Sequence, residues 1–217
     1  MDPQQEIEPY LEAAGQKGMR ITHIFETHVQ ADHLSGARKL ASATGASVLQ
    51  HASADVRFPH VPVEDEEEHE LGNVRVRVLH TPGHTPDGIS LVVTDLTRAP
   101  EPWFVLTGDT LFSGGVGRPD LLGDGVETTL ASQLYDSLHG KLLQLPDHIE
   151  VYPAHFGGAA CGKGLSGKPG STIGFERRFN PALQVVSRPD FVRFVLADLP
   201  PQPVGFAANR RRNLGLE

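Results

Sequence analysis

The chain has 217 residues, of which 39% are hydrophobic, 21% are charged and one is a cysteine. This length and composition allow one large domain with a real core and exclude a disordered or collagen-like chain. The formal net charge of −8 disfavours nucleic acid and anionic membranes as partners, and the single cysteine excludes an internal disulfide, which suits a reducing cytoplasm.

The pattern of apolar and turn-forming residues predicts alternating helices and strands, and no apolar run approaches the roughly 18 residues of a membrane span. In chain order we expect a helix at 5–14, a strand at 21–26, a helix at 34–43, a strand at 48–49, a loop at 51–62 and a solvated acidic turn at 64–70. Strands at 74–78, 89–93 and 103–106, a helix at 126–145, a strand at 149–152, a helix start near Asn180 and a helix at 191–196 follow. The glycine-rich segment 156–174 fits a flexible linker or an ordered loop equally well.

Histidine and aspartate side chains directly follow four of these strands. They lie in the stretches THVQADHLSG, HTPGHTPDG, VLTGDTLF and VYPAHFGG. The residues are His28, Asp32, His33, His84, Asp109 and His155. Because residues at strand ends converge on one cleft, and because imidazole and carboxylate are ligands of first-row metals, the sequence predicts a metal site.

The order of these motifs resembles the metallo-β-lactamase superfamily, whose signature is HxHxDH followed by separate His, Asp and His positions. The resemblance runs from about Asp2 to Asn180. It implies an α+β fold, a four-layer αββα sandwich with the metal site at one edge between the two sheets. In binuclear members, the first metal takes the two motif histidines and the next His, and the second takes Asp32, His33 and His155, with Asp109 bridging.

The chain departs from this signature at Gln30, which stands where the second motif histidine would be. A neutral amide is a poor ligand for zinc or iron, so His28, His84 and Asp109 remain for the first site. Two imidazoles and one carboxylate form the facial triad of non-haem Fe(II) oxygenases. With TGDTLFSGGVGRPDL and YPAH, the chain resembles the persulfide dioxygenases, which oxidise glutathione persulfide to sulfite and glutathione with O₂ and one Fe(II) per chain.

The remaining candidate residues receive roles around this iron. We expect Asp32, His33 and His155 to hydrogen-bond the ligands and orient persulfide or O₂ as catalytic residues, or to hold a second metal. Arg118 is a candidate for gripping a glutathione carboxylate, and a structural salt bridge with an aspartate is the alternative. Cys161 is a candidate for lining the substrate cleft, with a buried structural thiol as the alternative, and nearby Lys163 would favour its thiolate.

The main rival function is a zinc-dependent hydrolase with one or two Zn(II) ions. It would be a glyoxalase II-like thioesterase, a lactonase or a β-lactamase-type enzyme in which a metal-bound hydroxide attacks a carbonyl. Gln30 argues against it, as does the short stretch after His155. A metal-free binding protein that keeps only the fold is a further alternative, and the intact ligand positions argue against that class.

We expect one domain over residues 1–208 and a frayed tail or cloning scar over residues 209–217. The start resembles a chain that lacks the first strands of the superfamily's sheet, because the acidic segment DPQQEIEPYLEAA stands at the very beginning. An exposed sheet edge of that kind predicts a homo-oligomer. A persulfide donor would be a small thiol or a separate sulfurtransferase.

Overall fold

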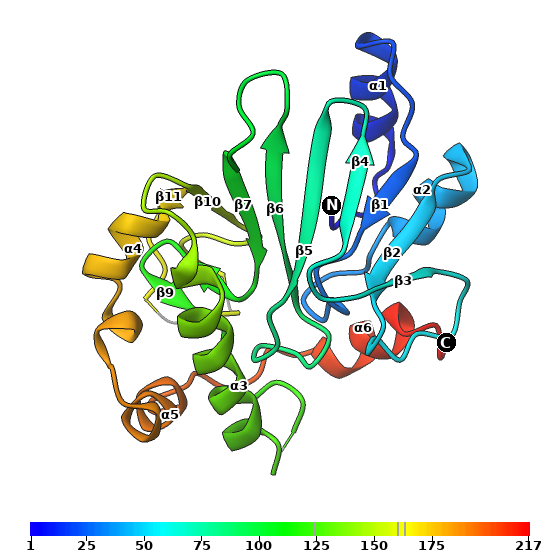
Figure 1. The fold of residues 1–217 in the computed structure, drawn as a ribbon. Helices are drawn as coiled ribbons and strands as arrows, with labels where there is room; N and C mark the ends of the chain where they lie inside the picture. Colours follow the sequence, from blue (N-terminus) through cyan, green and yellow to red (C-terminus); the bar gives the residue numbers. More distant parts are fainter. Residues whose placement is uncertain (124, 160, 163) are drawn as a thin grey trace.

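In the computed structural model, two β-sheets pack face to face and helices cover their outer faces (Figure 1). The structure describes residues 1–123, 125–159, 161–162 and 164–217. The smaller sheet is parallel, with the order β1-β2-β3, and the larger has the order β11-β10-β7-β6-β5-β4. A separate hairpin pairs β8 with β9.

The strands are β1 (His23–Phe25), β2 (Ser47–His51), β3 (Val61–Val63), β4 (Glu68–Leu71), β5 (Val74–His80), β6 (Ile89–Asp95), β7 (Phe104–Gly108), β8 (Leu111–Phe112), β9 (Gly115–Val116), β10 (Glu150–Pro153) and β11 (Ser171–Thr172). The α-helices are α1 (Glu8–Gln16), α2 (Ala37–Thr44), α3 (Glu127–Gly140), α4 (Ile173–Phe179), α5 (Arg188–Leu196) and α6 (Phe206–Asn213). Two short 3₁₀ helices cover Leu142–Gln144 and Pro181–Gln184.

Alternating side chains along the strands produce the layers. On β6, Leu91 and Val93 pack between the two sheets, whereas Val92 faces the cluster that includes residues of α3 and α5. On β1, Phe25 faces the larger sheet and Ile24 packs with residues of α2. Since a strand presents successive side chains to opposite faces, these clusters define four layers, αββα. The α+β fold and the four-layer αββα architecture expected from the sequence are confirmed.

Four local expectations differ from the structure. The acidic run is not wholly a turn, because Glu68–Leu71 forms edge strand β4, where Glu68 and Glu70 lie opposite Arg77 and Arg75 of β5. The expected loop at 51–62 ends in β3, and the expected helix at 126–145 ends at Gly140, before a 3₁₀ turn. The helix expected near Asn180 is also a short 3₁₀ helix.

The glycine-rich segment and the C-terminal tail contain structure that the sequence analysis does not anticipate. The end of the glycine-rich segment forms β11 and begins α4, whose first turn is capped by the Thr172 hydroxyl. In the tail, expected to be frayed, α6 extends to Asn213, and both Asn213 and Leu214 are buried. Fraying is therefore wrong for this part, because tertiary contacts hold it.

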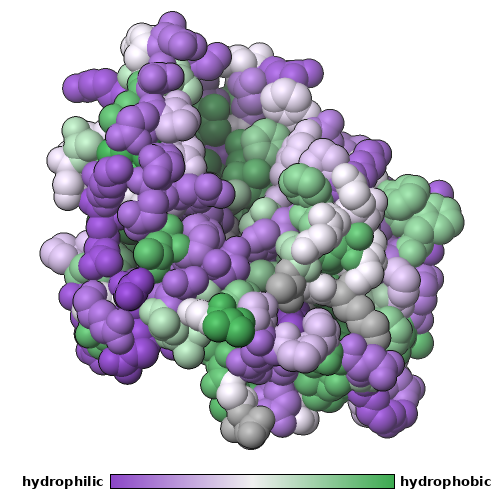
Figure 2. Space-filling model, turned by 180° about the vertical axis from the view of Figure 1, so that it is seen from behind, coloured by the Kyte–Doolittle hydropathy of each residue, from purple (hydrophilic) through white to green (hydrophobic). Residues whose placement is uncertain are grey.

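The outer surface differs between the two sides of the molecule. Seen from behind, hydrophilic residues cover most of the side that carries α1 and α2, and hydrophobic side chains are visible in a hollow beside it (Figure 2). Within the described ranges, none of the helices has both the length and the apolar composition needed to cross a bilayer.

Candidate metal centre

Strand ends bring the candidate residues together. His28 follows β1, His84 lies between β5 and β6, Asp109 follows β7 and His155 follows β10. Strands β7 and β10 are parallel neighbours, with Pro153 opposite Gly108, and the Ala154 backbone N–H donates to Gly108 O. Asp109 and His155 therefore leave the same edge of the larger sheet, as the sequence pattern predicts.

The first cluster consists of His28, His84 and Asp109. One ligand atom from each residue lies within 4.8 Å of the others, and all three side chains are buried. The two imidazole rings meet edge to face, with their centroids 5.1 Å apart. Burial lowers the pKa of His84, which favours the neutral ring that a metal requires.

In both histidines the Nδ1 atom is engaged in a hydrogen bond, and the Nε2 atom is left for a metal ion. His84 Nδ1 lies 2.8 Å from Arg118 O, and because a carbonyl only accepts, this nitrogen carries the proton. The unprotonated His84 Nε2 then faces Asp109 Oδ2 at 3.4 Å. That oxygen is buried without a hydrogen-bond partner among the described residues. The lone pairs of His84 Nε2 and Asp109 Oδ2 therefore face each other in a buried site, and a cation bound between them would satisfy both.

His28 is held in the same way by Thr27. The Thr27 hydroxyl donates its single proton to Asp2 Oδ2 at 2.9 Å, so its oxygen accepts from His28 Nδ1 at 3.0 Å. In a neutral ring this leaves the lone pair of His28 Nε2 for a metal ion. The trio thus offers two imidazole nitrogens and one carboxylate oxygen, a set that fits a first-row metal ion.

Gln30 is also buried, with 1% of its surface exposed. Its Nε2 lies 3.5 Å from His28 Nδ1, and its Oε1 has no hydrogen-bond partner in the described part of the chain. The residue that replaces a motif histidine therefore lies beside the first cluster and contributes an amide.

A second group of side chains surrounds His155. Its Nδ1 lies 2.8 Å from Asp109 Oδ1 and its Nε2 2.9 Å from Asp32 Oδ2, while His33 Nδ1 lies 3.1 Å from Asp32 Oδ1. Burial disfavours the charged forms of Asp32, Asp109 and His155, but the hydrogen bonds among them have a larger combined effect on their pKa values. They raise the pKa of His155 and lower the pKa of Asp32 well away from their ordinary values, and they hold the pKa of Asp109 at about 2. Both carboxylates are therefore ionised and suited to a cation.

Cys161 belongs to this second group. Its sulfur and one ligand atom each of Asp32 and His155 lie within 4.8 Å of one another. The side chain is buried, and burial raises the pKa of the thiol to about 12. Burial thus favours the neutral thiol, which is the alternative that the sequence analysis left open, and Lys163, which would favour the thiolate, lies outside the described residues.

The sequence model of the metallo-beta-lactamase superfamily matches residues 1–155, a range that includes every histidine and aspartate of both groups. The chain belongs to the metallo-beta-lactamase superfamily. The mitochondrial persulfide dioxygenase ETHE1 of Bos taurus is 31% identical over 97% of this chain and 79% of its own length. A hydroxyacylglutathione hydrolase of Methylococcus capsulatus is 36% identical over 68% of this chain and 53% of its own length.

Two solved structures of the superfamily superpose closely on this chain. A metallo-beta-lactamase from Staphylococcus aureus superposes with a TM-score of 0.90 at 33% identity, and this chain covers 64% of its length. ETHE1 from Myxococcus xanthus superposes with a TM-score of 0.80 at 33% identity, and this chain covers 87% of its length. In both comparisons 98% of this chain is covered.

In this superfamily member the Arg118 side chain is buried and paired. Its Nε and Nη2 donate to the two carboxylate oxygens of Asp120, at 2.8 and 2.7 Å, and Nη2 also donates to Pro200 O. This is the salt bridge that the sequence left as the alternative to substrate binding. The backbone of Arg118 serves the site directly, because its N–H donates to Cys161 O and its carbonyl accepts from His84.

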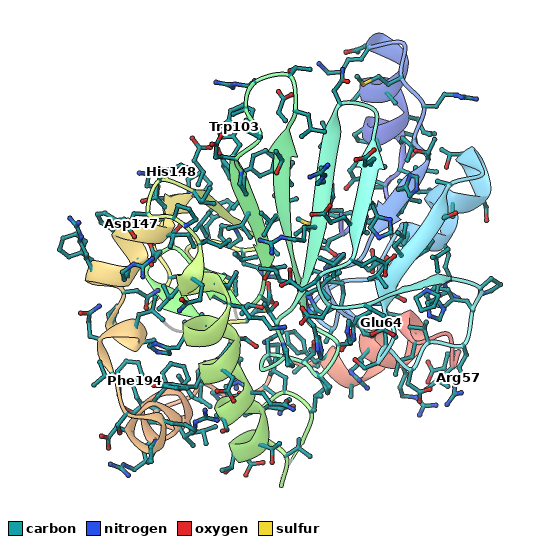
Figure 3. The ribbon with its side chains drawn as sticks, viewed as in Figure 1. Arg57, Glu64, Trp103, Asp147, His148 and Phe194 are labelled. Atoms are coloured by element: carbon teal, nitrogen blue, oxygen red, sulfur yellow. The ribbon has the colours of Figure 1, made fainter. Side chains whose placement is uncertain are left out.

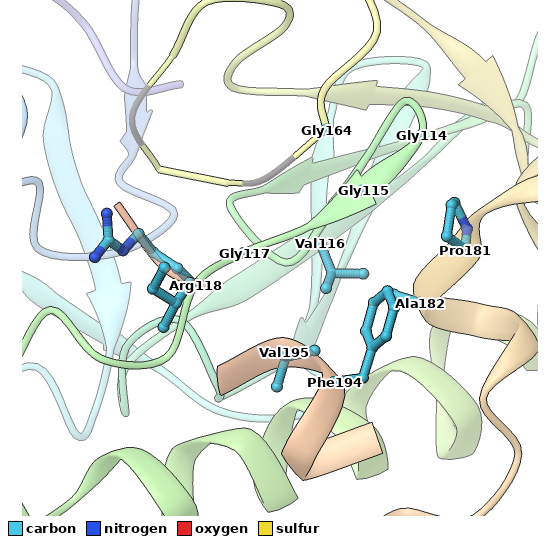
Figure 4. Close-up of a pocket in the computed structure, with 11 residues that line it drawn as sticks. Gly114, Gly115, Val116, Gly117, Arg118, Gly164, Pro181, Ala182, Phe194 and Val195 are labelled. Atoms are coloured by element: carbon cyan, nitrogen blue, oxygen red, sulfur yellow. The ribbon is translucent and has the colours of Figure 1, made fainter. Parts of the chain in front are cut away.

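An apolar cavity of about 200 Å³ lies against the same segment. Val116, Phe194 and Val195 line it, and the Arg118 guanidinium points away from these side chains (Figure 4). Among the described residues that line this cavity, none belongs to the cluster of His28, His84 and Asp109.

Two residues that hold the loop of His28 in place, Asp87 and Asn213, are absent from the predicted site. Asp87 Oδ2 accepts from the Val29 backbone N–H at 2.7 Å, and Asn213 Nδ2 donates to the backbone oxygens of Gln30 and His33. Asp87 lies in the stretch HTPGHTPDG, so a carboxylate beside the predicted site could have been noticed in the sequence. Nothing local in the sequence links Asn213 to a loop about 180 positions away.

Asp147 and His148 are an acid and a histidine that do not belong to the predicted site. Asp147 and His148 lie at the outer side of the molecule, near the start of β10 (Figure 3). Asp147 accepts from Arg177 Nε at 3.0 Å, which is a structural contact.

Proposed function

We propose that this protein is a non-haem iron dioxygenase that oxidises a low-molecular-weight persulfide, such as glutathione persulfide, to sulfite and the thiol. The observation that carries the proposal is the buried trio of His28, His84 and Asp109. Two imidazoles and one ionised carboxylate match the donor set of Fe(II) oxygenases, and Asp109 Oδ2, which has no hydrogen-bond partner among the described residues, accounts for one ligand position. The similarity to ETHE1 along almost the whole chain supports the same function.

Bound Fe(II) would supply electrons for O₂ and open positions for both the persulfide sulfur and O₂, which zinc cannot do by redox chemistry. The balanced reaction is RSSH + O₂ + H₂O → RSH + SO₃²⁻ + 2H⁺. His28 and His84 hold the ion from nitrogens whose opposite sides are fixed by Thr27 and Arg118 O. The role of Thr27 and of the Arg118 carbonyl is to hold each ring with its Nε2 atom toward the ion.

Asp32, His33 and His155 orient the reactants in this proposal. The protonated ring of His155 lies between the carboxylates of Asp32 and Asp109. An anionic persulfide that takes the place of one carboxylate could therefore accept a hydrogen bond from this ring. Cys161 adjoins the same side chains and contributes a neutral, buried thiol to the wall of the substrate cleft. A substrate-binding role for the Arg118 guanidinium requires its ion pair with Asp120 to open.

The second candidate is a zinc-dependent hydrolase. The extra donor atoms around Asp32 and His155 favour it, since a hydrolase of this superfamily can use two metal ions, and the chain is also similar to a hydroxyacylglutathione hydrolase. Gln30 argues against it, because an amide replaces one imidazole beside the first site.

Metal removal and reloading test the proposal. The protein is stripped of metal, reloaded anaerobically with Fe(II) or Zn(II), and supplied with either glutathione persulfide in air or S-lactoylglutathione. We expect O₂ uptake and sulfite release from the iron form only, with about one iron per chain bound through His28, His84 and Asp109. Thioester hydrolysis by the zinc form, without O₂ uptake by the iron form, would instead establish the hydrolase. A small persulfide supplied by a separate sulfurtransferase in the cytoplasm is the setting that this proposal implies.

A further inference from the structure

The C-terminal helix α6 lies along the loop that carries His28, Asp32 and His33. Residues 29–34 of this loop form neither helix nor strand, so no regular secondary structure fixes their backbone. Helix α6, drawn in red, lies beneath the two sheets (Figure 1). A segment close to the end of the chain therefore contacts a loop near its beginning, and this loop contains candidate metal ligands.

One buried asparagine at the end of α6 makes three hydrogen bonds to the loop backbone. Asn213 Nδ2 donates to Gln30 O and to His33 O, both at 2.8 Å, and Asn213 Oδ1 accepts from the Ser35 N–H at 3.0 Å. The two carbonyls can only accept and the N–H can only donate, so the amide has one possible orientation. Because the side chain is 7% exposed, water does not readily replace these bonds, and their loss would leave polar groups unsatisfied.

Other side chains on the same face of α6 extend this contact along the loop. Asn209 Nδ2 donates to Ala31 O at 3.1 Å, and Phe206 belongs to a buried cluster against which Ala31 packs. Leu214, directly after the helix, belongs to the same buried cluster as Val29, the neighbour of the first metal ligand. The helix face thus contacts the loop from residue 29 to residue 33.

We propose that α6 is a strap that positions the metal-binding loop, so that docking of this helix and binding of the metal ion stabilise each other. Asn213 is its positioning residue, because it acts through the backbone of Gln30 and His33 and is not itself a ligand. When α6 leaves the loop, His28 is no longer held in place and metal affinity falls. By linkage, the bound ion favours the docked helix by the same free energy. The inference goes beyond the proposed function, since it needs the metal centre and not the reaction.

Hydrogen exchange of the full chain, with and without Zn²⁺, tests the effect of the ion on the helix. If undocking of α6 released the ion completely, Zn²⁺ buffered at 100 times its dissociation constant would slow exchange of the α6 amides by about 100-fold. We expect the exchange to slow by at least about tenfold. Helix α1, which has no buried residues and opens locally, is the internal reference and should exchange at the same rate in both samples.

Asn213→Leu tests the effect of the helix on the ion. Leucine has nearly the same shape and no charge, so the change removes the hydrogen bonds without adding an electrostatic field at the metal site. We expect a 10–100-fold loss of Zn²⁺ affinity in competition with a chelator, the usual range for removing a group that supports a ligand. The Zn²⁺-dependent protection of α6 should disappear as well. Asn73→Leu, at an exposed asparagine, should change neither quantity.

Ile149→Val separates positioning from a general loss of stability. Ile149 is fully buried in the core cluster that includes residues of α3, so this variant should melt at a lower temperature but bind Zn²⁺ as the wild type does. The proposal is overturned if Zn²⁺ leaves the exchange of α6 unchanged in the wild-type chain, a result that needs no variant. It is also overturned if folded Asn213→Leu keeps the wild-type affinity or if Ile149→Val loses as much. These measurements use neither persulfide nor O₂, so their result is independent of the proposed reaction.

Discussion

At His28, a single threonine hydroxyl determines which ring nitrogen remains for a metal. The proton of Thr27 goes to Asp2, so the histidine must donate to Thr27 from Nδ1. His84 reaches the same protonation state through the Arg118 carbonyl. The candidate ligand residues themselves were predictable, because each comes shortly after an apolar strand. The groups that orient them were not, because Asp2 and Arg118 are distant in sequence from the histidines that they help to hold.

Thr27→Val tests this orientation. Valine has nearly the same shape but cannot accept from His28 Nδ1, so the ring is free to turn or to change its protonated nitrogen. We expect a 10–100-fold loss of first-site metal affinity, the usual range for removing a group that supports a ligand. Competition with a chelator measures it. Thr22→Val removes an exposed hydroxyl that contacts His23 instead and serves as the control; an equal loss in both variants would contradict the assignment.

Gln30→His tests the consequence of the missing motif histidine. The new imidazole would lie beside His28 and add a better ligand than the amide. We expect zinc affinity at the first site to rise at least about tenfold, equivalent to about 1.4 kcal/mol, and iron-dependent O₂ uptake to fall because an open position is taken. Gln50→His introduces histidine at another buried glutamine, on β2, and should change neither quantity. Unchanged zinc binding in Gln30→His would show that residue 30 does not face the ion.

Elements with strong periodicity were predictable, and those held by distant partners were not. The core strands β5, β6 and β7 have alternating or continuous apolar residues that indicate their conformation. The acidic strand β4 has no such signal, and its pairing depends on arginines across the ladder, including Arg75, which donates to Glu70 at 3.2 Å. Helix α6 is rich in arginine and asparagine, and buried Phe206 and Asn213 fix it.

The segment that joins β9 to Arg118 depends on a glycine. A Cβ at Gly117 would lie 1.9 Å from Asp109 O and 3.0 Å from His84 Cβ. We expect Gly117→Ala to push the segment away from both ligands, to destabilise the fold by about 1–3 kcal/mol, and to weaken first-site metal binding. Denaturant unfolding and chelator competition measure the two effects. Gly140→Ala, where a Cβ meets nothing within 4 Å, should leave both unchanged or slightly raise stability; if Gly117→Ala behaves in the same way, the close approach is not a constraint.

At the scale of the whole molecule, the two sheets meet at a stacked histidine pair that the sequence pattern did not distinguish. His51 ends β2 and His80 ends β5, and their rings stack with centroids 3.6 Å apart. Burial, and then the charge of His80, lower the pKa of His51. The strand positions were readable from the sequence, but the pairing of these two ends depends on how the sheets pack.

This pair predicts loss of stability in mild acid. Because the folded pKa of His51 is lower than its unfolded value of about 6.5, the unfolded chain binds more protons as pH falls below that value. The contribution is thus present above pH 6.5 and is lost as pH falls toward the folded pKa. His51→Gln should reduce the drop in melting temperature between pH 7.5 and about 5, whereas exposed His148→Gln should not. Equal pH dependence in the wild-type and His51→Gln proteins would contradict this role.

The most direct test of the central claim is the stoichiometry of O₂ and sulfite. The iron-loaded chain is given glutathione persulfide in air-saturated buffer, and O₂ uptake is measured alongside the sulfite released. We predict one O₂ consumed per sulfite formed, and loss of both signals in Asp109→Asn. Iron bound at His28, His84 and Asp109 without any persulfide-dependent O₂ uptake would contradict the assignment of this site as a dioxygenase.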